Sequence, residues 1–167
     1  MGLKYMAEGE NRRAVEMFKD AVRHNSENID AYIKLGVILR NEKLYNNAIR
    51  IHKDLLFRGT LAPETRNEVQ FHLAMDYLKS GNENKALEYL ENLKNDKKYS
   101  EAILDYLLNL YTNEKQWDKA IETIKSLPYT KTEDGKKRLA SFKVEQGKEI
   151  MATGNGKDAR VIFKDAL

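Results

Sequence analysis

Residues 71–93, FHLAMDYLKSGNENKALEYLENL, contain the pattern that decides the fold of this chain. They predict two short helices that fold against each other across a turn at residues 80–83. The second helix carries apolar residues at the spacing of one helical face, and these are Ala86, Leu87, Leu90 and Leu93. Gly81 suits the left-handed conformation that often ends a helix. Neither helix can bury its apolar stripe alone, so the pair requires neighbours like itself.

The same pattern recurs along the whole chain in one register. An alanine early in each second helix is followed by mostly apolar residues four and seven positions later. The five sets are Ala14/Phe18/Ala21, Ala48/His52/Leu55, Ala86/Leu90/Leu93, Ala120/Ile124/Leu127 and Ala159/Phe163/Ala166. Tyr5, Leu39, Tyr77, Tyr111 and Ile150 precede these alanines by nine positions, and Gly2, Gly36, Ala74, Leu108 and Gly147 precede them by twelve. The alanines are 34, 38, 34 and 39 residues apart, and an interval of 34 is the period of the tetratricopeptide repeat.

These intervals predict an all-α, right-handed α-solenoid of about five tetratricopeptide-like antiparallel helix pairs. The 167 residues form one domain in this prediction, with repeats at about 1–28, 29–62, 63–98, 99–131 and 132–167. The second repeat is expected to end at Arg58-Gly59-Thr60, and proline at position 63 to start the next helix. The first repeat lacks the start of its first helix and the last has no polar capping helix after it. We therefore expect a fragment of a longer protein, whose uncapped ends would allow self-association.

Composition excludes several classes of function. The formal net charge is only +3, too small to indicate a nucleic-acid partner. The two basic runs, residues 94–99 and 136–138, are surrounded by acidic residues and are interpreted as solvated surface. There is no cysteine, which removes disulfides, cysteine zinc sites and thiol nucleophiles and fits a reducing compartment. No run of about 18 apolar residues is present, so we expect no direct insertion of this chain into a membrane.

The sequence offers little for catalysis. His24, His52 and His72 lie far apart, and none stands in an H-E-x-x-H motif or beside a serine–acid pair. His52 occupies a place in a buried stripe, which predicts a hydrogen-bonded core histidine rather than a ligand. Residues 154–157, GNGK, lack the spacing of a phosphate-binding loop and fall at a predicted turn between helices. We therefore predict a non-enzymatic protein without a cofactor or a metal.

One part of the chain carries a more particular pattern. It consists of Arg40, residues 47–52 (NAIRIH), Leu55, Leu56, Arg58, Leu61, Arg66, residues 73–81 (LAMDYLKSG) and residues 117–121 (WDKAI). Together with the insertion after the second repeat, this pattern resembles the bacterial lipopolysaccharide assembly protein B family over most of the chain. The resemblance implies cytoplasmic repeats on a protein that one N-terminal helix anchors to the inner membrane and that ends in a rubredoxin-like zinc domain. It also implies an adaptor that helps a membrane-bound protease degrade the deacetylase that commits lipid A synthesis. Only the repeat region can match here, because this sequence has neither the membrane helix nor any cysteine.

In stacked helix pairs the first helices line a concave face, where we predict a groove for a protein or peptide segment. Its candidate residues are Ile33, Val37, Arg40 and Asn41 in the second repeat, Phe71, Met75, Leu78 and Lys79 in the third, Asp105, Asn109 and Thr112 in the fourth, and Lys148 in the fifth. A carboxylate clamp of lysine and asparagine is not expected, since Ile33 and Val37 hold the corresponding turns. Two alternatives stay open: the apolar members pack repeat against repeat, or the module serves another bacterial assembly with an unrelated partner.

Overall fold

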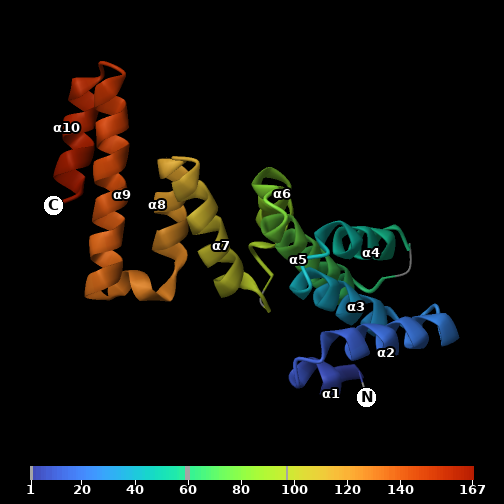
Figure 1. Cartoon of the computed structure of the whole chain (residues 1–167). Coiled ribbons are helices and arrows are strands. Elements are labelled where there is room, and N and C mark those ends of the chain that lie inside the picture. The colour runs from blue at the N-terminus through green and yellow to red at the C-terminus, as the bar shows by residue number, and fades with distance from the viewer. Residues whose placement is uncertain (1, 59–60, 97) are drawn as a thin grey trace. The chain divides into compact units, whose positions relative to one another are not determined.

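The computed structural model describes residues 2–58, 61–96 and 98–167, and in these ranges it contains helices and turns but no strand. Figure 1 shows the helices in chain order. They are α1 (Gly2–Ala7), α2 (Asn11–His24), α3 (Ile29–Asn41), α4 (Tyr45–Phe57), α5 (Pro63–Lys79), α6 (Glu83–Leu93), α7 (Ser100–Asn113), α8 (Trp117–Ser126), the 3-10 helix η1 (Pro128–Lys131), α9 (Glu133–Ala152) and α10 (Gly156–Asp165). The all-α prediction is confirmed. The predicted end of the second repeat falls partly on Gly59 and Thr60, and the first basic run includes Lys97; these three residues lie outside the described ranges.

The helices form two compact units, residues 1–93 with α1 to α6 and residues 94–167 with α7 to α10. In the first unit each helix packs on the next one along the chain, and α3 also packs on α5. In the second unit α7 packs on α8, α8 on α9 and α9 on α10, while η1 packs on α8 and α9. This sequential packing of hairpins is the arrangement that the repeats predict.

Every hairpin turns through one residue in the left-handed conformation. These residues stand five positions before the five repeat alanines, and they are Gly9, Lys43, Gly81, Lys115 and Gly154, with φ between 57° and 87°. The two lysines accept a conformation that costs an L-residue about 1–2 kcal/mol. The register of the turns therefore follows the register of the sequence pattern, including the two turns that lack glycine.

The five repeat alanines are buried, with exposed fractions of 0–1%. In three of the hairpins, residues sixteen positions apart also approach each other closely. Where the second helix supplies a ring, the first supplies glycine: the pairs are Gly2/Phe18, Gly36/His52 and Gly147/Phe163. Where the second helix supplies an aliphatic side chain, the first carries Ala74 or Leu108. A Cβ atom on Gly147 would lie 2.5 Å from Cε1 of Phe163, closer than carbon atoms pack.

The second unit is also stabilised between its last two helices. Lys143 of α9 forms an ion pair with Asp165 of α10 at 2.7 Å. The hydrogen bond and charge of Lys143 hold the pKa of that carboxyl below its ordinary value. Trp117 is the first residue of α8, and the centroid of its ring lies 6.3 Å from that of Phe142 in α9.

We predict that Gly147→Ala destabilises the protein by about 1–3 kcal/mol, because the added methyl group overlaps the Phe163 ring. Adding Phe163→Leu should restore part of this loss, because the third repeat has alanine and leucine, Ala74 and Leu90, at the positions equivalent to Gly147 and Phe163. Urea unfolding followed by circular dichroism measures both effects as a double-mutant cycle.

Gly156→Ala is the matched control, because nothing lies within 4 Å of a Cβ atom built at that position. Equal stabilities for the two alanine variants would show that close approach at Gly147 is unimportant.

Candidate interaction surfaces

The first unit places eight predicted groove residues on α3 and α5, the first helices of two neighbouring pairs. Asn41 and Lys79 are exposed, whereas Val37, Phe71 and Leu78 are half-buried. Because α3 packs on α5, these side chains come from adjacent helices. We call these five residues the α3/α5 face; they offer apolar edges with polar side chains at the helix ends.

Two of the predicted groove residues belong to the core instead. Ile33 is only 6% exposed and packs with Leu55, Leu61 and Val69. Met75 is 8% exposed. The prediction that their side chains line a groove is therefore wrong at these two positions. At Ile33 the alternative holds, since this residue packs one helix pair against the next.

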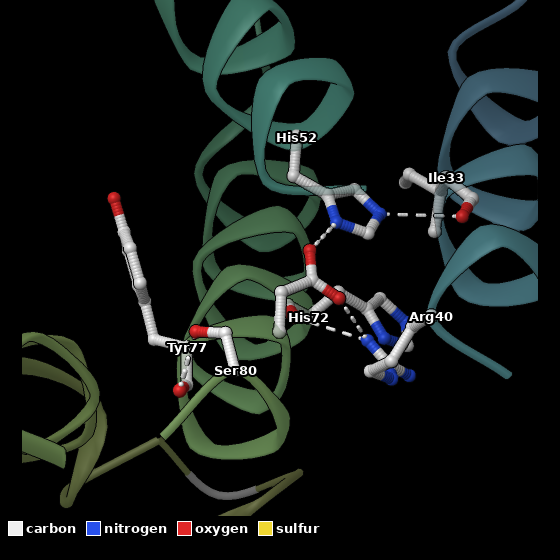
Figure 2. Close-up of polar contacts among 7 residues, drawn as sticks. Ile33, Arg40, His52, His72, Tyr77 and Ser80 are labelled. Atoms are coloured by element: carbon white, nitrogen blue, oxygen red, sulfur yellow. Dashed lines mark hydrogen bonds and ion pairs between the residues drawn. The ribbon is translucent and has the colours of Figure 1, made fainter. Parts of the chain in front are cut away.

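Arg40, another predicted groove residue, takes part in a buried ionic network with Asp76 and His52. The guanidinium donates to Asp76 Oδ1 at 2.7 Å and to the carbonyl oxygen of His72 at 3.1 Å. His52 donates from Nδ1 to Asp76 Oδ2 at 2.5 Å, and its Nε2 lies 3.3 Å from the carbonyl oxygen of Ile33. In Figure 2, dashed lines join His52 to Ile33 and Arg40 to His72. The prediction of a hydrogen-bonded core histidine is confirmed.

This network joins three helices. Arg40 comes from α3, His52 from α4 and Asp76 from α5. The side chains of His52 and Asp76 are fully buried, and that of Arg40 is 12% exposed. The His52 ring also stacks on that of His72, with 5.6 Å between centroids. Burial of a carboxylate costs free energy unless charged or hydrogen-bonding partners compensate, and here Arg40 and His52 do so. The network therefore fixes α5 relative to α3 and α4.

We predict that Asp76→Ala lowers the free energy of unfolding by about 3–5 kcal/mol, because it leaves a buried guanidinium and imidazole without their acceptor. Chemical denaturation checks the value. Asp30→Ala, which removes a 73% exposed partner of Lys34 in the same unit, should cost less than about 1 kcal/mol. A similar small loss for both variants would contradict a structural role of the buried carboxylate.

The second unit combines Asp105 and Asn109 with two residues that were not predicted for the groove. The Tyr129 hydroxyl donates to Asp105 Oδ1 at 3.3 Å. Arg138 donates to the Tyr129 oxygen at 3.1 Å and to Asn109 Oδ1 at 3.4 Å. These four residues form the polar cluster of α7, η1 and α9. Arg138 belongs to a basic run of the sequence, and its hydrogen bonds show that part of this run has an internal role.

The two other predicted residues of this unit lie outside the polar cluster. The Thr112 hydroxyl donates to the carbonyl oxygen of Leu108 on its own helix. Lys148 is exposed and forms an ion pair with Glu145 at 2.6 Å. In the second unit, therefore, the structure groups two of the four predicted residues.

Burial raises the pKa of Tyr129 above its ordinary value of 10.0, and the charge of Asp105 raises it further, while Arg138 opposes both. The unfolded chain therefore loses this proton first as the pH rises. The stability that the hydroxyl contributes is complete below about pH 10 and is lost as the pH passes the folded-state pKa.

We accordingly predict that Tyr129→Phe is less stable than the wild type near neutral pH, by about 1 kcal/mol for the lost hydrogen bonds. Its stability should fall less steeply above pH 10. Urea midpoints measured for both proteins from about pH 8 to 11 test this, and parallel pH profiles would contradict it.

Residues 2–58, 61–96 and 98–167 contain neither a candidate metal site nor a candidate membrane-spanning helix. No group of three or more histidine, aspartate or glutamate residues is arranged to hold a metal ion. No helix in these ranges combines the length and the hydropathy needed to cross a membrane.

Comparison with known proteins gives relatives in sequence and in fold. No protein-family model matches the chain. It is 24% identical over 163 residues to lipopolysaccharide assembly protein B of Escherichia coli K12, which covers 98% of this chain and 42% of that protein. The crystal structure of MamA superposes with a TM-score of 0.66 at 20% identity, covering 99% of this chain and 92% of MamA. The crystal structure of YrrB, a TPR protein with an unusual peptide-binding site, superposes with a TM-score of 0.66 at 18% identity. The match covers 99% of this chain and 80% of YrrB.

The fold is therefore that of a tetratricopeptide-repeat (TPR) solenoid. In sequence, the chain resembles the repeat region of lipopolysaccharide assembly protein B. It spans about two fifths of the length of the curated relatives that it matches.

Proposed function

We propose that this chain is a non-catalytic adaptor module of a bacterial lipopolysaccharide-assembly regulator. It binds a segment of a lipid A biosynthesis enzyme, the deacetylase, and presents that enzyme to a membrane protease on the cytoplasmic side of the inner membrane. The observation that carries this proposal is the similarity to lipopolysaccharide assembly protein B over 98% of the chain. The partner is a protein segment, and no nucleic acid or cofactor takes part.

The α3/α5 face supports binding of such a segment. It combines half-buried apolar side chains, Val37, Phe71 and Leu78, with the exposed polar groups of Asn41 and Lys79. Aromatic side chains at the centre of an interface commonly contribute most of its binding energy, and Phe71 is the aromatic residue of this face. The side chain can both pack against its own helix pair and contact a partner.

Rigidity of the first unit favours the same function. The Arg40–Asp76–His52 network holds α3 and α5 in one arrangement, so the α3/α5 face is formed before a partner arrives. A preorganised surface loses less conformational entropy on binding than a flexible one. The network therefore supports affinity without contacting the partner.

We expect Phe71→Lys to weaken binding of the purified deacetylase at least tenfold, as measured by biolayer interferometry, while the helical circular dichroism signal stays unchanged. Phe57→Lys is the matched control, because Phe57 of α4 is 80% exposed and lies outside the α3/α5 face. Equal affinities of the two variants would contradict this binding surface. Loss of helical signal in Phe71→Lys would instead assign Phe71 to the core.

The second candidate is a TPR module that serves another bacterial assembly. The fold similarity to MamA and to YrrB, a TPR protein with an unusual peptide-binding site, favours it. In that case the deacetylase would not bind, and Phe71→Lys would reduce binding of a different partner. Self-association through the outer helices stays a prediction for either candidate.

A further inference from the structure

The first unit contains a groove lined by residues of α2, α3 and α4. Helices α2 and α4, the second helices of the first two pairs, both pack on α3 and line a cavity of about 610 Å³. Leu35 and Leu39 of α3 contribute buried apolar surface, and Val15, Leu44 and Ile51 add accessible apolar side chains. We call this site the α2/α4 groove. It shares no residue with the α3/α5 face.

Leu44 is the least expected residue of the α2/α4 groove. It occupies the N-cap position of α4, makes no side-chain cap hydrogen bond and is 49% exposed. Serine, threonine, aspartate or asparagine at an N-cap stabilises a helix by about 1 kcal/mol relative to an apolar residue. Leucine supplies no cap hydrogen bond here, and about half of its side chain stays exposed to water. A contact with a partner gives this side chain a role.

The charges at the edge of the groove are not balanced. Both lining carboxylates are engaged: Glu16 pairs with Lys19 at 3.1 Å, and Glu42 accepts from the Asn11 amide at 2.6 Å. Arg12 of α2 and Arg50 of α4 are exposed and line the same groove. Within the part of the chain that the structure describes, neither arginine has an ion-pair or hydrogen-bonding side-chain partner. The groove thus combines an apolar floor with two available guanidinium groups on opposite helices.

This chemistry fits one kind of occupant. An apolar floor between two helices accepts the apolar face of a third helix, and guanidinium groups bind carboxylates through paired hydrogen bonds. Nucleic acid is disfavoured, because the floor is aliphatic and offers no stacking ring among its lining residues.

We propose that the α2/α4 groove binds an acidic amphipathic helix of a protein partner. The apolar face of that helix contacts Val15, Leu44 and Ile51, and its flanking carboxylates pair with Arg12 and Arg50. This site is additional to the one in the proposed function and does not depend on it.

The test uses a synthetic helical peptide of about twelve residues, with leucines on one face and glutamates on both sides of them. Titrated into the isotope-labelled 19.4 kDa chain, it should bind with a Kd below about 1 mM. Amide shifts in two-dimensional NMR spectra should concentrate on α2 and α4. A peptide with lysine in place of glutamate should bind at least tenfold more weakly.

Two variants make the test specific. Arg12→Glu combined with Arg50→Glu should reduce affinity at least tenfold, whereas Lys157→Glu combined with Arg160→Glu, which changes two exposed cations of α10 by the same charge, should not. Leu44→Asp should also abolish binding, yet keep or raise stability, because aspartate is a favourable N-cap residue.

Absence of binding, shifts confined to other helices, or equal affinity of the two double variants would overturn the proposal. None of these results would affect the proposed function, which concerns Phe71 and the deacetylase.

Discussion

Close approach of the two helices within each hairpin is the constraint on which the rest of the structure depends. In three of the hairpins a ring in the second helix packs against a glycine sixteen positions earlier in the first, as at Gly36/His52 and Gly147/Phe163. Because this contact sets the distance between the two helices, it also determines where the buried alanines lie. It likewise determines the distance that each turn must span between the helix ends. Stacking of one hairpin on the next then follows from the apolar stripes that the hairpins leave uncovered.

The second hairpin adds a polar interaction to this contact. Its ring is an imidazole, so the same close approach that packs His52 against Gly36 also directs it toward the carboxylate of the following pair. The residue that fills this packing position therefore also binds a carboxylate, and Arg40 donates a second hydrogen bond to the same carboxylate. The gain is a defined arrangement of three helices, since buried charges tolerate few alternative geometries. The α3/α5 face and the α2/α4 groove both use helices of this rigid set.

Local periodicity predicts the helices, the turns and the buried alanines, because each depends on residues close in sequence. It also predicts His52 as a core residue from its place in the stripe. It could not show that Arg40 and Asp76 are partners, since they lie 36 positions apart and only the stacking of pairs unites them. Spacing likewise could not separate Ile33 from Val37 on one helical face, because how deeply each is covered depends on the neighbouring pair. Asp76 gave one usable signal, a charged residue among the apolar positions of its helix.

The glycine–ring pairs also restrict the order in which such a sequence can change over time. A hairpin that carries a ring cannot first gain a methyl group opposite it, since the intermediate would be overpacked. The ring must shrink first, after which alanine or leucine becomes acceptable on the facing helix, as in the hairpins with Ala74 and Leu108. Exchange in the left-handed turns is freer, because glycine and lysine both occur there. Substitutions at the glycine–ring contact must therefore occur in a fixed order, with the ring replaced before the glycine. Substitutions between glycine and lysine in the turns can occur in either order.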